Sequence, residues 1–408
     1  MTASSAPPAG LLIVSVDRLP AWILPAFGCT WASTPCLDGL AGRGLVLDRI
    51  IAGGDDPCAT LAALAGRGPE DPAAWPLLEA ALTRGWSPAV VTDDEAFATR
   101  LPAGVMTRCL PAEAVPRIAA TVAETSLGRL FAAATELAAT GNHRLLWLHA
   151  ASLGRGWDAP AEFRSAYLDP DDPPPPPGAT VPQLQVTAET DPDLVAVVRQ
   201  VFAGQLMLFD RCLSGLVSAV ATSSQSALAA PWVVLMAGVR GLPLGLHGLI
   251  GPLPLPPYGE LVHLPAVLVD HEGRMAAQRY GGLLLPADLG ATLVELVAGG
   301  RPAAADPRAG RSLGPLLEEW RFEPRDRAVA VTSHGIAVAT PAWQLVLATA
   351  AGQPAVFAKP DDYFELNDVA DRCPDVAEEL AAIARQAAVD PHGAWLAPLS
   401  PAATRGPQ

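Results

Sequence analysis

A run of residues at positions 11–16, apolar except for Ser15, ends in Asp17. A run so short and so apolar is typical of a strand buried on both faces of a parallel sheet. Helical patterns separate it from similar runs at 88–92, 144–149, 232–236 and 266–269. This alternation predicts an α/β fold with a doubly wound, largely parallel sheet and helices on both faces. Because polar side chains at the carboxyl ends of such strands meet in a crevice, Asp17 is the first candidate site residue.

Two helix starts carry capping signals. Ser33 and Thr34 stand before Pro35, Asp56 stands before Pro57, and an Ala/Leu-rich pattern follows each proline. A side-chain oxygen at the N-cap accepts a free backbone N–H, and proline suits the first helical position. We therefore expect helices to begin at these prolines, with Asp56 as an N-cap. Longer helical patterns cover 127–139, 197–220 and 376–388.

The pattern divides the chain into a large and a small part. Residues 11–325 carry the α/β alternation, while 326–392 hold short alternating strands and a helix, typical of a small antiparallel sheet with one helix. Positions 169–193 contain five consecutive prolines and several acids, which predicts an extended surface excursion. Residues 1–10 are expected to be disordered, and 393–408 are expected to form a frayed tail.

The amino-acid composition excludes some classes of function. Half of the residues are hydrophobic and 17% are charged, which is typical of globular proteins with a large core. The formal net charge of −15 repels phosphate groups, so we expect neither nucleic acid nor an anionic membrane surface as a partner. The amino-terminal positions lack the basic and apolar parts of a signal peptide, which predicts a cytoplasmic protein.

The six cysteines are scattered, and no cysteine or histidine lies at metal-ligand spacing from them. This pattern indicates neither a zinc site nor a disulfide framework. We expect most of these cysteines to be small, buried hydrophobic residues.

Several sequence fragments occur in the order found in the sulfatase family of the alkaline-phosphatase superfamily. LLIVSVD and STPCLDGLAGRGLVLDRIIA resemble the family's first strand and the helix after it, and LLWLH resembles a strand that delivers a histidine. GLHGLIGPLP resembles a stretch beyond the family's D-H-G motif, and TPAWQL resembles a strand of its C-terminal subdomain. The resemblance covers about 11–388. It implies a sulfatase-like fold, a Ca²⁺ site and a formylglycine nucleophile.

The positions that would hold the metal ion have changed. In sulfatases, two Asp at the end of the first strand bind Ca²⁺ together with an Asp and an Asn or His at a later strand end. Asp17 matches the first of these ligands, whereas Arg18, Val239 and Arg240 stand at the others. Because Ca²⁺ takes about six to eight oxygen ligands, we expect this chain to hold no metal and no cofactor. A guanidinium, Arg240 in preference to Arg18, is expected to pair with Asp17 in the cation's place.

The nucleophile position is also altered. Alignment on the family's C-x-P-S-R segment places Asp56 at the nucleophile, and a short gap would place Cys58 there without the following Pro and Arg. A thiol at a helix start has some reactivity, but an inert buried thiol is the more frequent case. Asp56 is more often a cap than a nucleophile. His149 and His247 survive at family positions, either as an acid–base pair or, more often, as hydrogen-bonded structural residues.

Two functions from different classes remain. The leading hypothesis is a non-catalytic, sulfatase-like pseudoenzyme with a binding, scaffolding or regulatory role, whose partner is a protein or a small anionic ligand. The alternative is a metal-independent hydrolase of sulfate or phosphate esters with a site rebuilt around Cys58, His149 and His247. This alternative requires a nucleophile and a base within hydrogen-bond reach. A third hypothesis is a small anion bound between Arg18 and Arg240.

Overall fold

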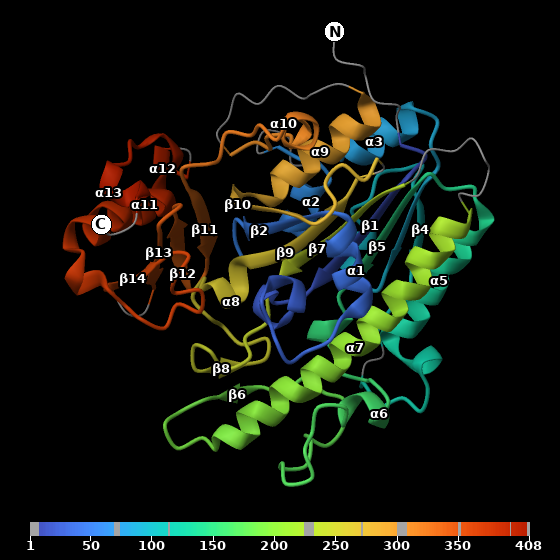
Figure 1. Ribbon diagram of the computed structural model, residues 1–408, viewed down its shortest axis with the longest axis horizontal. Coiled ribbons are helices and arrows are strands. Elements are labelled where there is room, and N and C mark those ends of the chain that lie inside the picture. Colours follow the sequence, from blue (N-terminus) through green and yellow to red (C-terminus); the bar gives the residue numbers. More distant parts are fainter. Residues whose placement is uncertain are drawn as a thin grey trace.

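An eight-stranded sheet forms the centre of the protein (Figure 1). The computed structural model describes residues 8–68, 74–112, 115–223, 232–270, 272–299, 308–349, 352–391 and 393–405. The strands span Leu11–Asp17 (β1), Leu45–Ile51 (β2), Pro88–Thr92 (β3), Met106–Cys109 (β4), Leu145–Ala150 (β5), Val233–Arg240 (β7), His263–Val269 (β9) and Gln278–Leu284 (β10). Their order is β10-β2-β9-β7-β1-β5-β3-β4. Only β9 runs antiparallel to its neighbours, so the predicted largely parallel sheet is confirmed.

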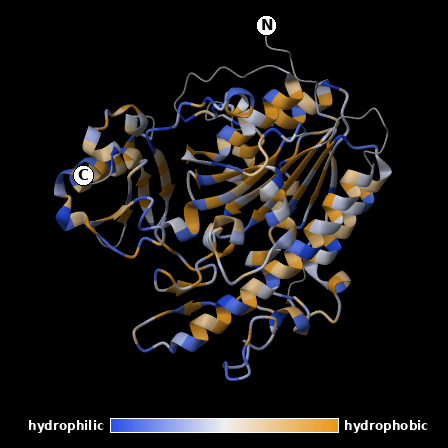
Figure 2. Cartoon of the chain, in the orientation of Figure 1, coloured by the Kyte–Doolittle hydropathy of each residue, from blue (hydrophilic) through white to orange (hydrophobic). Residues whose placement is uncertain are grey.

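Helices cover both faces of this sheet. The main ones span Pro57–Leu64 (α2), Pro76–Thr83 (α3), Pro286–Ala298 (α9), Pro35–Arg43 (α1), Ser126–Thr140 (α5) and Pro192–Ser223 (α7). Shorter ones span Glu95–Ala98 (α4), Ala161–Arg164 (α6), Gly259–Val262 (α8) and Gly314–Glu319 (α10). In β1, Leu11 and Ile13 share a core with α2, α3 and α9, whereas Leu12, Val14 and Val16 share another with α1, α5 and α7. Both faces of the strand are apolar because both are covered. Figure 2 shows hydrophobic residues along the strands of the central sheet.

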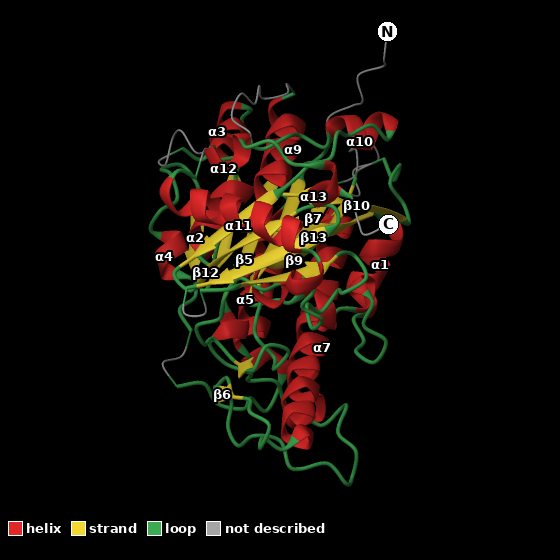
Figure 3. Ribbon diagram, turned by 90° about the vertical axis from the view of Figure 1, so that its left-hand side faces the viewer, coloured by secondary structure: helices red, strands yellow, loops and turns green. Residues whose placement is uncertain are grey.

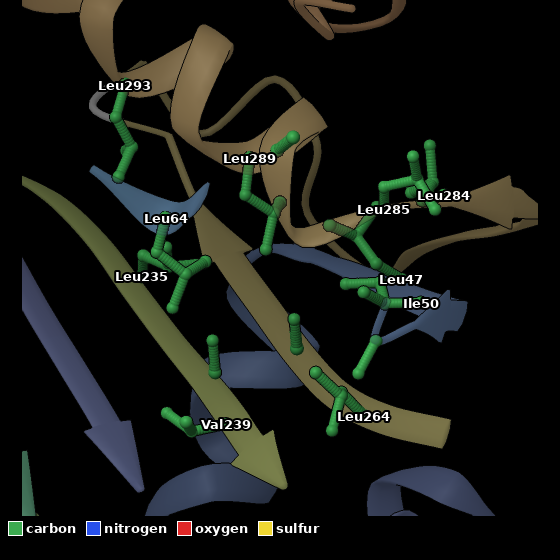
Figure 4. Packing of buried hydrophobic residues seen from close by; sticks show 14 of the residues in the cluster. Leu47, Ile50, Leu64, Leu235, Val239, Leu264, Leu284, Leu285, Leu289 and Leu293 are labelled. Carbon is green, nitrogen blue, oxygen red and sulfur yellow. The ribbon is translucent and has the colours of Figure 1, made fainter. Parts of the chain in front are cut away.

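One part of the core lies between α2, α9 and the sheet (Figure 4). Leu64 of α2 and Leu289 of α9 lie in one buried cluster with Leu235 of β7. The two helices approach closely because Gly290 has no side chain: a Cβ at this position would lie 2.0 Å from Ala63 O. This contact holds the C-terminal end of α2 against α9.

A β-bulge interrupts β2 opposite Pro265 of β9. Leu47 and Ile50 both pair with β9, but Asp48 and Arg49 are inserted between them. Proline has no N–H to donate to the ladder, and a bulge accommodates such a gap while turning side chains to a new direction. Asp48 and Arg49 are accordingly the two partly exposed residues of an otherwise buried strand.

A second sheet forms a small C-terminal subdomain next to the β2–β10 side of the main sheet (Figure 1). Its strands span Ala328–Thr332 (β11), Gly335–Ala339 (β12), Trp343–Ala348 (β13) and Pro354–Ala358 (β14), and the helix Pro374–Val389 (α11) covers one face. The four strands pair antiparallel in sequence order. The antiparallel sheet and helix expected from the sequence are therefore confirmed.

The described residues nearest to both chain ends contact the fold. The tail expected to fray instead forms two short helices, Gly393–Leu396 (α12) and Pro401–Thr404 (α13), each with a buried alanine packed against α11. That expectation was wrong for the described residues because these alanines, with Trp395 and Leu399, pack into the core of the C-terminal subdomain. At the other end, Gly10 O accepts a hydrogen bond from Val233 N at 3.0 Å, so the expected disorder does not extend to this residue. Residues 1–7 lie outside the described residues.

The proline-rich excursion contains some regular structure. Leu184–Gln185 (β6) pairs antiparallel with Leu249–Ile250 (β8), and α7 begins at Pro192, inside the segment expected to be irregular. Figure 3 shows α7 extending well beyond the sheet. Within the described residues, α7 is also the helix whose length and composition would suit a membrane span, but 56% of its most apolar window is buried, as in a core helix of a soluble protein.

The start of α1 is capped by another helix. The side chain of Thr34, the expected cap, makes no capping hydrogen bond. Instead, Asp210 of α7 accepts from Cys36 N at 2.9 Å and from Leu37 N at 2.8 Å. A carboxylate at a helix N-terminus satisfies free N–H groups and favours the helix dipole. A tertiary contact has thus replaced the local one.

A buried ion pair joins α9 to the segment that leads into the C-terminal subdomain. Arg325 Nε donates to Asp288 Oδ2 at 2.9 Å, and its Nη2 donates to Oδ1. Asp288 also accepts from Leu285 N and Arg311 N, both at 2.7 Å. Both charged side chains are almost fully buried, so the attraction between them must offset the cost of removing each charge from water.

Asp288→Asn should therefore destabilise the protein strongly, because it leaves the Arg325 charge buried without this carboxylate. We expect a loss of about 3–5 kcal/mol in the free energy of unfolding. Glu136→Gln, which breaks the exposed Arg108–Glu136 pair, is the matched control and should cost at most about 1 kcal/mol. Urea denaturation measures both losses, and equal losses would contradict the prediction.

Candidate functional site

Arg240 and Asp17 form a bidentate ion pair at the carboxyl edge of the sheet. Arg240 Nε donates to Asp17 Oδ1 at 3.1 Å, and Nη2 donates to Oδ2 at 2.7 Å. Asp17 is only 5% exposed, so an unpaired carboxylate at this position would be costly. The planar guanidinium satisfies both oxygens at once. The predicted pairing of Arg240 with Asp17 is confirmed.

A register shift in β7 brings the two side chains together. Val16 of β1 pairs with Gly238, but the next residue, Asp17, pairs with Arg240. Val239 is the extra residue, and its side chain is fully buried in the core (Figure 4). The shift therefore gives Val239 a hydrophobic environment and turns Arg240 toward Asp17.

Arg240 also holds the loop before α2. Its Nη1 donates to Asp55 O at 3.0 Å, so one guanidinium joins the ends of β1 and β7 to this loop. Arg18 lies nearby, where its Nη1 donates to Gly241 O at 3.4 Å. Burial, followed by the charge of Arg240, lowers the pKa of Arg18 to about 10. Three of the five N–H donors of Arg240 are engaged and Asp17 already balances its charge, which argues against an anion held between Arg18 and Arg240.

Asp56 serves as the cap of α2. Its Oδ1 accepts from Cys58 N at 2.9 Å, and Pro57 occupies the first helical position, so this prediction is confirmed. Burial raises the pKa of the Cys58 thiol, and the positive charge of Arg100 opposes this only in part. A protonated thiol is a weak nucleophile. All six cysteines are unpaired and partly exposed, so the expectation that most would be buried was wrong.

His149 lies one residue before the end of β5 and is fully buried, with Nδ1 hydrogen-bonded and Nε2 without a partner. Its Nδ1 lies 3.0 Å from Ser15 Oγ, which also accepts from Trp147 Nε1 at 2.9 Å. The indole can only donate, and the Ser15 hydroxyl keeps its own proton and a second lone pair for Nδ1, so this contact fits either neutral tautomer of His149. Nε2 is 3.9 Å from Asp94 Oδ2, too far for a hydrogen bond. Burial lowers the pKa of His149 and favours the neutral ring.

Asp93 and Asp94 belong to the same edge and were missed in the sequence. Asp94 caps α4 by accepting from Ala96 N at 3.0 Å, and it lies 3.6 Å from Arg155 Nη2. Asp93 Oδ1 accepts from Ala151 N at 2.7 Å, and burial raises the pKa of Asp93. The sequence contains a signal for this pair, because two acids follow the apolar run of β3 just as Asp17 follows the apolar run of β1.

His247 lies in a different environment. Its Nδ1 is 3.2 Å from Glu260 Oε2 of α8, and its Nε2 is 3.2 Å from Glu365 O of the C-terminal subdomain. Both ring nitrogens are thus used to hold the loop after β7 in place. Within the described ranges, no hydrogen bond links His247 to Cys58 or His149, so the three residues of the hydrolase hypothesis do not form one constellation.

The donor set does not fit the calcium ion that the sulfatase resemblance implies. Among the residues that the structure describes, no group of three or more His, Cys, Asp and Glu side chains could hold a metal ion. Both oxygens of Asp17 accept from Arg240, whereas Ca²⁺ needs about six to eight oxygens. The positive charges of Arg18 and Arg240 further disfavour a dication beside Asp17.

No protein-family model matches the chain, and no curated protein matches its sequence. Solved structures match it over almost its whole length. The phosphonate monoester hydrolase of Agrobacterium radiobacter superposes with a TM-score of 0.70 at 15% identity, covering 94% of this chain and 95% of that one. A 2-O GAG sulfatase superposes with a TM-score of 0.65 at 16% identity, covering 95% and 92%. The chain has the sulfatase fold.

The phosphonate monoester hydrolase of Silicibacter pomeroyi also superposes on this chain, with a TM-score of 0.69 at 16% identity, covering 93% of this chain and 94% of that one. The sulfatase fold that the sequence resemblance implied is thus confirmed. Identities this low establish the fold alone. In this sulfatase fold, the pair Asp17–Arg240 stands at the strand ends where the resemblance places the metal.

Removing one partner of this pair should destabilise the protein. Arg240→Met and Asp17→Asn should each lower the free energy of unfolding by about 3–5 kcal/mol, because each leaves a largely buried partner unpaired. In the double variant the two losses should be far from additive. Urea denaturation of the four proteins measures the coupling, and additive losses would show that the pair contributes nothing.

Cys58 should carry an ordinary, weakly reactive thiol. Its alkylation by iodoacetamide should be slow at neutral pH and should accelerate only above the usual thiol pKa of about 8.5, because burial disfavours the thiolate. Peptide mass spectrometry follows the reaction, with Cys58→Ser as the control that assigns the peptide. An aldehyde in place of the thiol, or fast labelling below neutral pH, would contradict this prediction.

Proposed function

We propose that this protein is a non-catalytic binding protein on the sulfatase fold, a pseudoenzyme with a recognition, scaffolding or regulatory role. The bidentate Arg240–Asp17 pair is the observation that carries the proposal. It occupies both oxygens of the one acidic ligand that the sulfatase resemblance retains. A guanidinium has no acceptor and is not deprotonated in proteins, so it cannot activate a water molecule as a metal ion does.

The surrounding groups support the same conclusion. Asp56 is used as a helix cap, and burial keeps the Cys58 thiol protonated. The described residues contain no hydrogen bond between Cys58 and His149, whose free nitrogen is 3.9 Å from Asp94. Nucleophilic catalysis requires a nucleophile and a base within hydrogen-bond reach. The partner of such a protein is another protein or a small anionic ligand.

The alternative, a metal-independent hydrolase of sulfate or phosphate esters, has less support. It would require His247 to leave Glu260 and Glu365, both of which it contacts. It would also require the pKa of Cys58 to fall, against the effect of burial. In its favour, burial lowers the pKa of His149 and raises the pKa of Asp93, and shifted pKa values are common at functional sites. These two residues alone form no complete site.

The purified protein should bind no stoichiometric divalent metal and should not hydrolyse aryl sulfates, aryl phosphates or phosphonate monoesters. Elemental analysis and turnover assays measure both properties. Ca²⁺ should leave the melting temperature unchanged. Arg18→Asp/Arg240→Asn, which places oxygen ligands beside Asp17, should by contrast be stabilised by Ca²⁺. One metal ion per chain in the unmodified protein, or clear turnover, would overturn the proposal.

A further inference from the structure

A cavity of about 410 Å³ lies between the main sheet and the C-terminal subdomain. The bulge of β2 contributes Asp48 and Arg49 to it, and the C-terminal subdomain contributes Gln344 and Tyr363. In the strand order, β2 is three positions from β1, which corresponds to about 14 Å. The cavity is therefore separate from the site at Asp17.

The charges around this cavity do not balance. Three cationic side chains, Arg49, Arg279 and Lys359, line it together with two carboxylates, Asp48 and Glu365. Arg279 Nε donates to Asp48 Oδ2 at 3.2 Å, and Lys359 Nζ lies 3.0 Å from Glu365 Oε1. Both carboxylates thus already have a cationic partner. In the described part of the chain, Arg49 has no carboxylate within ion-pair distance.

Arg49 is held in place by backbone groups only. Its Nη1 donates to Pro341 O at 2.8 Å and its Nη2 to Thr340 O at 2.9 Å. Burial lowers the pKa of Arg49 to about 10, and the charge of Glu365 offsets this only in part. A guanidinium has five N–H donors, so others remain for a ligand.

Two neutral polar groups at this cavity also lack a partner. Gln344 is 2% exposed, and its Nε2 is buried without a hydrogen bond. The hydroxyl of Tyr363 is likewise buried and unpaired. Most buried polar groups in proteins are hydrogen-bonded, so two unpaired donors beside an unbalanced cation require an explanation.

The remaining wall is mostly apolar, and its one further titratable side chain, His263, is neutral because burial lowers its pKa to about 4. Phe27, Ile51 and Pro360 line the cavity, and its volume falls within the range of about 300–1,000 Å³ seen for small-molecule sites. We propose that this cavity binds a small organic anion, with a carboxylate, sulfate or phosphonate group on an aromatic or aliphatic body, through Arg49, Gln344 and Tyr363. This inference does not depend on whether the site at Asp17 is catalytic.

Isothermal titration of the full chain with benzoate, phenylphosphonate and phenyl sulfate tests the proposal. At least one of these probes should bind once per chain, whereas neutral benzamide should bind far more weakly. Arg49→Met should reduce the affinity roughly tenfold or more, the usual effect of losing a hydrogen bond to a charged group. Gln344→Met should also weaken binding. Arg108→Met on β4, at the opposite edge of the sheet, should leave the affinity unchanged.

Equal affinity of the parent and Arg49→Met would overturn the proposal, as would equal binding of benzamide. Failure of all three anions to bind at about 10 mM would overturn it as well. If Arg49→Met does not fold by circular dichroism, Gln344→Met decides alone, and an unchanged affinity then refutes the site. Loss of binding in Arg18→Met but not in Arg49→Met would place the anion at the Asp17 edge and refute this cavity.

Discussion

The carboxyl edge of the central sheet depends on how the charge of one carboxylate, Asp17, is neutralised. The strand ends there because a polar side chain follows an apolar run, and its near-complete burial demands a positively charged partner. Arg240 supplies this partner and in addition binds the carbonyl of Asp55. One guanidinium therefore joins β1, β7 and the loop before α2. A metal ion at the same place would do similar structural work but would also leave coordination positions open for substrate.

An arginine in place of a metal ion also determines the roles of the residues around it. An arginine fork uses fixed directions, so its hydrogen bonds specify the positions of the elements that it joins. Once the loop before α2 is held by Arg240, Asp56 is free to cap the helix, and Cys58 becomes a half-buried residue of its first turn. The histidine that survives on β5 is hydrogen-bonded to Ser15 through Nδ1, burial favours its neutral ring, and its Nε2 is buried without a partner. Asp17 and Asp56 thus have structural roles that need no chemistry.

Sequence reasoning predicted those features in which local pattern and position agree. The apolar run before Asp17, the proline after Asp56 and the ordering of family-like fragments located the edge of the sheet and the Arg240 pairing. Contacts between segments that are far apart in the sequence could not be predicted from local pattern. Asp210, which caps α1, stands more than a hundred residues after it, and the packing of the tail depends on α11. Asp93 and Asp94 could have been found, because they follow a strand as Asp17 does.

Pro265 of β9 links the two sites discussed above through backbone geometry. On one side, a Cβ on Gly238 would lie 2.6 Å from Pro265 Cδ, so β7 passes close to this proline one residue before the shift that positions Arg240. On the other side, the bulge in β2 opposite Pro265 directs Arg49 into the cavity. A proline inside a sheet removes a ladder hydrogen bond, and its neighbours must then depart from regular pairing. The bulge that carries Arg49 therefore lies in the pairing of β2 with β9, whereas the shift that turns Arg240 lies one strand further on, in the pairing of β7 with β1.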